Sequence, residues 1–134
     1  MIIGIGIDVA DVARYDFDET QRARFARRVY TEAEMAHAMK HRHFAERLAG
    51  AFAAKEAARK AFGHAIPWRL VGVRHERSGK PYLEFLGRVS TLPALRGVRR
   101  MHLSITHTKN TAVAVLVLEG DEAGLAMSAE VAAR

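Results

Sequence analysis

The chain of 134 residues contains no cysteine, so it has no disulfide and no thiolate that can serve as a nucleophile or metal ligand. It also has no apolar run approaching the roughly 20 residues that span a bilayer. The opening MIIGIGIDV has neither a basic leader nor a small-residue cleavage site, which is typical of a strand and not of an export signal. These absences predict a cytoplasmic protein that does not act on a membrane.

Acidic residues are outnumbered by basic ones, 15 to 21, which gives a formal net charge of +6. This excess predicts a polyanionic partner and leaves nucleic acid, an acidic protein and a phosphate-rich small molecule as candidates. Aromatic residues make up only 7% of the chain, and no basic strand carries aromatic side chains that would stack on bases. The composition therefore argues against nucleic acid.

The length predicts a single domain, which we place at residues 1–120, followed by a weakly patterned, alanine-rich tail at 121–134. Residues 1–9 alternate with a period of two, which predicts a strand. Its isoleucines at 3, 5 and 7 share a face that we expect to be buried. Gly4, Gly6 and Asp8 share the other face, where the glycines would leave room for a ligand. A cap or turn at a strand end is an equally ordinary role for Asp8.

Residues 11–30 are rich in arginine and predict a helix whose inner stripe contains Phe25 and Val29. Three arginines can then be presented outward: Arg14, Arg24 and Arg28. Exposed guanidinium groups suit carboxylates or phosphates on a partner, although a solvated helix face has the same composition.

A second helix is expected from Thr31, where TEAE forms a capping box. His37, His41 and His43 follow, but 41 and 43 lie on different helical faces and no matching ligand set accompanies them. Solvated polar side chains are therefore a better interpretation than a metal site.

The central stretch FAAKEAARKAFG, residues 52–63, predicts a helix that can extend back to Arg47 and ends at Gly63. At 100° per residue its alanines gather on one side. Four charged residues gather on the other: Lys55, Glu56, Arg59 and Lys60. A plain surface helix with a Glu56–Lys60 pair has this pattern. The three cations beside Glu56 can also balance phosphate charge.

The rest of the chain predicts two pairs of antiparallel strands. Strands at 70–75 and 82–86 flank the turn SGKP, and strands at 101–106 and 111–118 flank HTKN. The run AVAVLVL is apolar on both faces, so we expect it at the centre of a sheet. The connection 87–100 is a helix or a loop. Ser104 and His107 are close in sequence, but no nucleophile elbow supports a serine hydrolase.

Asp8 and Glu56 are the acidic residues in the most unusual sequence surroundings. Two carboxylates without a thiol or paired histidine favour a hard cation. Mg²⁺ accepts one or two protein carboxylates together with water and substrate phosphates. A metal in this setting polarises phosphorus, so the residues point to phosphate chemistry.

Five motifs together resemble the holo-acyl-carrier-protein synthases, the short trimeric class of 4′-phosphopantetheinyl transferases. They are MIIGIGIDVADVAR, RFARRVYTEAE, FAAKEAARKAFG, SGKPY and MHLSITHTKNTAVAVLVLE, and they span residues 1–119. The resemblance implies an α+β fold in which a long helix packs on an antiparallel sheet. It also implies a homotrimer with active sites at the subunit boundaries.

The resemblance implies an activity as well. An enzyme of this family transfers 4′-phosphopantetheine from coenzyme A to a serine of apo acyl carrier protein, for fatty acid biosynthesis, and releases adenosine 3′,5′-bisphosphate. Polyketide or peptide carrier proteins are alternative acceptors. A non-catalytic basic module that docks acidic carriers or nucleic acid is the alternative from a different functional class.

By this resemblance Asp8 and Glu56 match the family's Mg²⁺ ligands, and Lys60 matches the lysine that meets the coenzyme diphosphate and can protonate the leaving group. The other positions that match coenzyme contacts are Gly63, Lys80, Pro81, His107 and Thr108. The outward arginines, Arg14, Arg24 and Arg28, match the basic surface that receives the carrier protein. The proton of the carrier serine goes either to Glu56 or to a water held by the metal.

Two segments depart from the family pattern. Residues 64–66 are His-Ala-Ile, followed by Pro67 and Trp68, where the family usually has Thr-Gly-Ile, so we expect the loop over the coenzyme to differ. Thr111 stands where the family often has an aromatic residue, which affects one wall of the pocket.

Overall fold

The computed structural model describes residues 1–121, so the predicted tail from residue 122 onward lies outside the described residues. The chain has an α+β fold, as predicted. Its elements in order are β1 (Ile2–Asp11), η1 (Val12–Tyr15), α1 (Glu19–Val29), α2 (Glu32–Met39), α3 (Phe44–Phe62), η2 (Trp68–Leu70), β2 (Val71–His75), β3 (Pro81–Phe85), η3 (Gly87–Val89), α4 (Leu92–Leu95), β4 (Val98–His107) and β5 (Thr111–Gly120).

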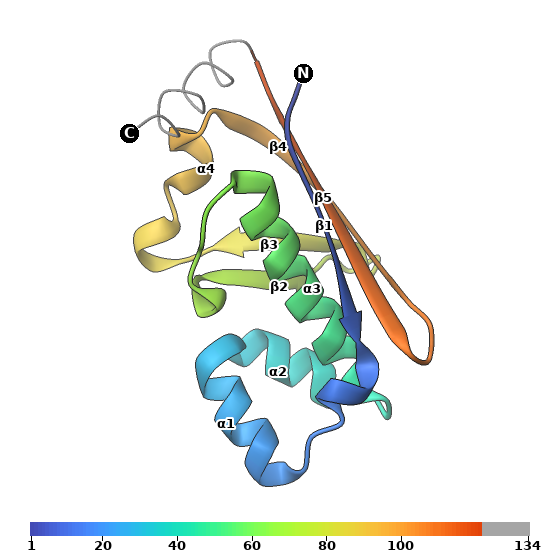
Figure 1. Ribbon diagram of the computed structural model, residues 1–134. Coiled ribbons are helices and arrows are strands. Elements are labelled where there is room, and N and C mark those ends of the chain that lie inside the picture. The colour runs from blue at the N-terminus through green and yellow to red at the C-terminus, as the bar shows by residue number, and fades with distance from the viewer. Residues whose placement is uncertain (122–134) are drawn as a thin grey trace.

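The main sheet is antiparallel and has the strand order β1-β5-β4. The strand β5 therefore occupies the centre, as its apolar run predicts, and Asp8 of β1 stands opposite Ala114. The hairpin formed by β2 and β3 is a separate two-stranded sheet. In Figure 1, α3 runs alongside β1 and β5, with the hairpin on its other flank and α1 and α2 at one end.

The helix α3 packs on the sheet through its alanines, of which Ala53, Ala54, Ala57 and Ala58 are fully buried. The approach is close because β1 presents glycine. A Cβ atom on Gly6 would lie 1.9 Å from the carbonyl oxygen of Ala57, a distance that no side chain tolerates. Gly6 thus permits the contact that brings the neighbouring Asp8 beside the helix.

The two faces of β1 are exchanged relative to the prediction. The glycine face is covered by α3 and leaves no open hollow, whereas the opposite face is open in the single chain. Ile5, Ile7 and Val9 are 63%, 57% and 61% exposed. The prediction failed because alternation shows that one face is apolar but does not show what covers it.

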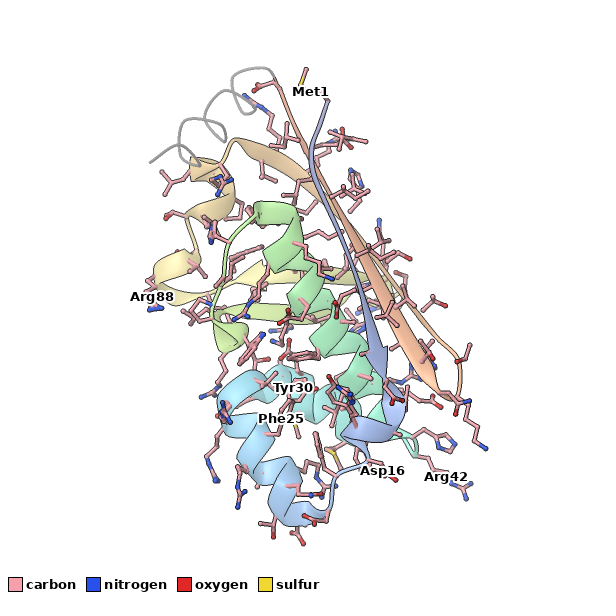
Figure 2. The ribbon with its side chains drawn as sticks, viewed as in Figure 1. Met1, Asp16, Phe25, Tyr30, Arg42 and Arg88 are labelled. Atoms are coloured by element: carbon pink, nitrogen blue, oxygen red, sulfur yellow. The ribbon has the colours of Figure 1, made fainter. Side chains whose placement is uncertain are left out.

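The helix α2 begins at the predicted capping box at Thr31, and α3 ends at the predicted Gly63, which adopts a left-handed φ of 80°. The helix expected over residues 11–30 is shorter, because α1 begins after a capping box at Asp18 and η1 precedes it. Phe25 and Tyr30, labelled in Figure 2, lie side by side with ring centroids 5.7 Å apart and help join α1 to the body of the protein. No helix within residues 1–121 is long and apolar enough to cross a membrane.

Candidate active site

Asp8 and Lys60 meet where β1 crosses α3. The Nζ atom of Lys60 lies 2.9 Å from Oδ1 of Asp8 and donates a second hydrogen bond, also of 2.9 Å, to the backbone carbonyl of Ile7. The Lys60 side chain is 54% exposed and that of Asp8 18%. The ammonium group is therefore held at the surface, where solvent and a substrate can reach it.

Glu56 lies one helical turn before Lys60, on the same side of α3. Its Oε1 atom accepts a hydrogen bond of 2.6 Å from Nε1 of Trp68 and lies 3.5 Å from a guanidinium nitrogen of Arg59. About a quarter of the Glu56 side chain is exposed. The carboxylate is thus anchored on one oxygen and open to solvent.

The buried phenol of Tyr15 is affected by the charge of both Asp8 and Glu56. Its pKa is raised to about 12, first by burial and then by the negative charge of Asp8, with a smaller contribution from Glu56 and an opposing one from Arg14. Both carboxylates thus act on the electrostatic surroundings of this one phenol. Two carboxylates with open coordination positions suit Mg²⁺, which needs only one or two protein ligands when substrate phosphates complete its shell.

Lys55 does not belong to this cluster, contrary to the prediction from the helical wheel. Its side chain is fully buried, and Nζ lies 2.8 Å from Oε1 of Glu34. The same atom donates hydrogen bonds of 2.8 Å to the carbonyls of Trp68 and Val71. Burial lowers the pKa of Lys55, and the Glu34 carboxylate opposes that shift. Because all three N–H groups are used inside the protein, Lys55 is structural and cannot neutralise a phosphate.

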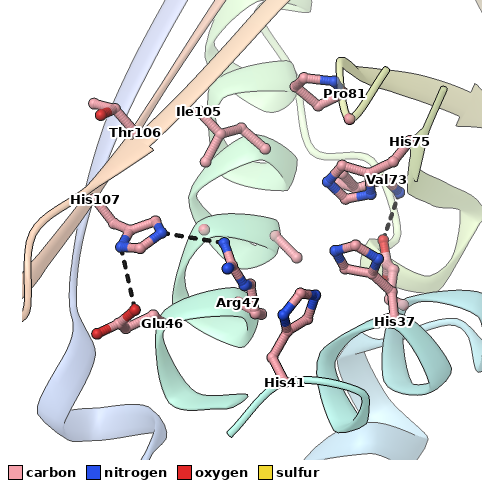
Figure 3. Close-up of a pocket in the computed structure, with 14 residues that line it drawn as sticks. His37, His41, Glu46, Arg47, Val73, His75, Pro81, Ile105, Thr106 and His107 are labelled. Atoms are coloured by element: carbon pink, nitrogen blue, oxygen red, sulfur yellow. Dashed lines mark hydrogen bonds and ion pairs between the residues drawn. The ribbon is translucent and has the colours of Figure 1, made fainter. Parts of the chain in front are cut away.

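A cavity of about 420 Å³ lies between α2, the first half of α3, the hairpin and the end of β4 (Figure 3). His107 projects from β4 at one side, and Pro81 lines the hairpin side. The Nε2 atom of His107 lies 3.2 Å from the Arg47 guanidinium, and Nδ1 lies 3.3 Å from Glu46. Arginine only donates, so Nε2 is the acceptor and Nδ1 carries the proton that faces Glu46. The ring is thereby fixed in one tautomer.

Comparison with known proteins decides the family. Residues 4–116 match the model of the 4′-phosphopantetheinyl transferase superfamily. The chain belongs to this superfamily.

The chain is similar to individual members over most of its length. It is 40% identical to a holo-[acyl-carrier-protein] synthase of Koribacter versatilis, with 89% of this chain and 99% of the relative covered. The corresponding protein of Nitrosospira multiformis is 41% identical with the same coverage. The Bacillus anthracis synthase solved with CoA (3′,5′-ADP) has 35% identity and a TM-score of 0.72, covering 90% of this chain and 99% of that one. The Neisseria meningitidis synthase has 31% identity and a TM-score of 0.77, with 89% and 99% covered.

The residues that match superfamily motifs fall into two groups within one chain. Asp8, Glu56 and Lys60 form the first group, and none of them lines the cavity beside His107. At 100° per residue, Glu56 and Lys60 lie on the side of α3 opposite Arg47. Within a single chain, His107 therefore does not lie beside the carboxylates of Asp8 and Glu56.

The remaining matched positions lie at the edges of these groups. Gly63 ends α3 beyond Lys60, and Lys80 is exposed in the turn before Pro81. The hydroxyl of Thr108 accepts hydrogen bonds from the backbone of Asn110 and Thr111 and so shapes the β4–β5 turn. Three arginines are exposed, one in η1 and two spaced one turn apart in α1: Arg14, Arg24 and Arg28.

Sequence reasoning missed four side chains that contact residues of the candidate site or lie close to them: Tyr15, Glu46, Arg47 and Trp68. Their contacts join segments far apart in sequence, as in the 60-residue separation of Arg47 and His107. Only Trp68 carried a signal, because it is the sole tryptophan and lies in the segment that departs from the family pattern.

The sequence predicted that the histidines in and after α2 are solvated, but His37 and His41 line the cavity. His37 stacks on His75 with ring centroids 4.0 Å apart, and both line the cavity with His41. Within residues 1–121, no group of three or more histidine or acidic side chains is arranged to hold a metal. The pKa of His37 is lowered to about 4, first by burial and then by the positive charge of His75, His41, Arg47 and Lys40.

This depressed pKa predicts a pH dependence of stability. Between pH 6.5 and about 4 the unfolded chain binds a proton at His37 and the folded one does not, so stability present above pH 6.5 is lost as the pH falls. We expect His37→Gln to reduce that loss by about 1 kcal/mol, allowing for solvent screening. Urea unfolding at pH 7, 6 and 5 measures how the free energy of unfolding changes with pH. His64→Gln, at an exposed position, is the control, and identical slopes for the two variants would contradict the expectation.

Proposed function

We propose that this protein is a holo-[acyl-carrier-protein] synthase. It transfers 4′-phosphopantetheine from coenzyme A to a serine of apo acyl carrier protein in the cytoplasm, for fatty acid biosynthesis, and releases adenosine 3′,5′-bisphosphate. The observation that carries the proposal is the cluster of Asp8, Glu56 and Lys60, formed by β1 and α3 in a chain that is similar over 89% of its length to synthases of this name. The basic composition of the chain agrees with a phosphate-rich substrate and an acidic carrier.

Asp8 and Glu56 would hold Mg²⁺. The ion, when bound, supplies positive charge to the diphosphate of coenzyme A. Lys60 is free enough in solvent to move its ammonium group from Asp8 to a phosphoryl oxygen, and it can donate a proton to the leaving phosphate. The proton of the carrier serine goes to Glu56, whose second oxygen is open to solvent, or to a water molecule beside it. The serine oxygen then bonds to the β-phosphorus as the bond to adenosine bisphosphate breaks.

The separation of His107 from the carboxylates supports an active site shared between subunits. Each chain carries the cluster of Asp8, Glu56 and Lys60 on one side of α3 and the cavity beside His107 on the other. A neighbouring copy would bring its own cavity to the carboxylates of Asp8 and Glu56. The exposed apolar face of β1 supplies a surface for such a neighbour, because monomeric proteins rarely leave a contiguous patch of this kind in water. A homotrimer with its sites at the boundaries accounts for both observations.

The apolar face of β1 is the place to test the assembly. We expect Ile7→Lys to convert a trimer to single chains, because a charged side chain would be buried among the apolar residues of the interface. Light scattering after gel filtration measures the mass. Met39→Lys, which alters an exposed apolar residue of α2, is the control and should leave the mass unchanged. A mass unchanged by Ile7→Lys would rule out this face as the interface.

Mass spectrometry of the carrier tests the activity. The protein is mixed with coenzyme A, Mg²⁺ and apo acyl carrier protein, with an active synthase in parallel. We expect the carrier to gain one phosphopantetheine, and chelation of the metal to prevent the gain. A carrier of unchanged mass beside a converted positive control would overturn the proposal. Repeating the assay with polyketide and peptide carriers defines the acceptor range.

A further inference from the structure

The indole of Trp68 holds one oxygen of Glu56 in place. Its Nε1 atom donates a hydrogen bond of 2.6 Å to Oε1, across 12 residues of sequence. Arg59 approaches the same oxygen at 3.5 Å. Among residues 1–121, no hydrogen bond or ion pair reaches Oε2. The carboxylate is therefore fixed through one oxygen and presents the other.

Trp68 is itself braced from several directions. The guanidinium carbon of Arg59 lies 4.3 Å from the centre of the indole ring, and the ring of Phe52 is 5.8 Å away. The backbone carbonyl of Trp68 accepts a hydrogen bond from the buried Lys55, and Arg59 also donates to the carbonyl of Ile66 at 2.9 Å. These contacts tie the segment after Gly63 to α3, so the indole N–H is a donor of fixed position.

The chemistry of this donor suits a metal ligand. An indole N–H only donates and carries no charge, so it orients a carboxylate without neutralising it. Arg59, the nearby cation, stacks on the indole and donates its Nε–H to Ile66, and its distance to the Glu56 oxygen is long. The negative charge of Glu56 therefore remains available to a bound cation. Partners that orient a ligating carboxylate in this way change metal affinity by about 10-fold to 100-fold.

We propose that Trp68 is a positioning residue that orients Glu56 toward the divalent cation of the active site. The inference rests on the proposed function, in which Asp8 and Glu56 hold Mg²⁺. It assigns a role to the segment at 64–68, whose sequence departs from the family pattern. Because the effect acts on the metal, it is measurable without turnover.

Tryptophan analogues give a test with minimal change to the protein, because Trp68 is the only tryptophan in the chain. Benzothienylalanine has nearly the size and shape of tryptophan but carries sulfur in place of the N–H group. The analogue 5-fluorotryptophan keeps the N–H and is the matched control. Mn²⁺ serves as the probe for the Mg²⁺ site, and its affinity is measured by water-proton relaxation with coenzyme A present, since substrate phosphates complete such sites.

We expect the Mn²⁺ dissociation constant to rise about 10-fold to 100-fold in the benzothienylalanine protein and to be unchanged in the 5-fluorotryptophan protein. Thermal unfolding shows whether each protein is folded. If benzothienylalanine impairs folding, Trp68→Phe also removes the N–H group, and its Mn²⁺ affinity is compared with that of the unmodified protein. Equal Mn²⁺ affinity with and without the N–H would overturn the role of Trp68 and leave the proposed function intact. No Mn²⁺ binding to the unmodified protein would overturn both.

Discussion

Replacing Lys55 with methionine should lower the free energy of unfolding by about 3–5 kcal/mol. Methionine has a similar volume, so the loss comes from electrostatics and hydrogen bonds and not from a cavity. The change leaves the Glu34 carboxylate buried without its cation, and it removes the donor for the carbonyls of Trp68 and Val71. Urea or guanidinium unfolding at pH 7 measures the loss.

The matched control is Lys60→Met, which makes the same chemical change four residues along the same helix. Lys60 is more than half exposed and its ion pair with Asp8 lies at the surface. Its replacement should change stability by about 1 kcal/mol or less. Similar losses for the two variants would show that Lys55 is not the buried structural cation described here.

Asp8→Asn and Glu56→Gln should each reduce transfer to the carrier protein by about 1,000-fold. Both changes keep the shape and an acceptor oxygen but remove the charge that would hold the metal. Metal stabilisation of the transition state contributes several kcal/mol, and each 1.4 kcal/mol corresponds to about a factor of ten. The rate of formation of modified carrier, followed by mass spectrometry, measures the effect.

Binding of the carrier protein separates this expectation from the alternative of a non-catalytic docking module. Both variants should bind the carrier as the original protein does, because the outward arginines, Arg14, Arg24 and Arg28, remain unchanged. Glu84→Gln is the matched control, since Glu84 is a partly exposed carboxylate of β3 paired with Arg74. Full activity of the Asp8 and Glu56 variants would remove the chemical basis of the proposed mechanism.

Local signals predicted the elements of the fold well. The capping box at Thr31, the glycine after α3 and the apolar run of β5 each depend on neighbours in sequence, and the structure confirms all three. The helix α3 begins at Phe44, earlier than the predicted Arg47, because no strong start signal stands there and its N-terminal residue makes no side-chain cap. The connection 87–100 contains η3 and α4, elements too short to show a period.

The predictions for Lys55 and for the isoleucines of β1 were wrong because a sequence pattern does not show which other part of the structure covers a face. A helical wheel places Lys55 among the charged residues of α3, but the hairpin covers this flank and buries the ammonium group beside Glu34. The same limit explains why the isoleucines of β1 were expected inside. An apolar face of a strand does not reveal whether its own chain or another copy covers it.

The site was predicted in part. Asp8, Glu56 and Lys60 were identified from motifs, and the structure places Asp8 and Lys60 in contact with Glu56 one turn away. The contact of Trp68 with Glu56 was not predictable, because it depends on how an irregular segment returns to the helix. The catalytic roles of Asp8 and Glu56 are tested by the Asp8→Asn and Glu56→Gln variants.

The central claim is that Glu56 of one chain works with His107 of another. Mixing two inactive variants tests it most directly. Glu56→Ala and His107→Ala proteins are each assayed alone and then after joint unfolding and refolding. If sites form between subunits of a trimer, about one quarter of the sites in a random mixture combine an intact Glu56 with an intact His107. We predict that each variant alone is nearly inactive and that the mixture recovers about a quarter of the original turnover. A mixture no more active than its separate components would contradict the shared site.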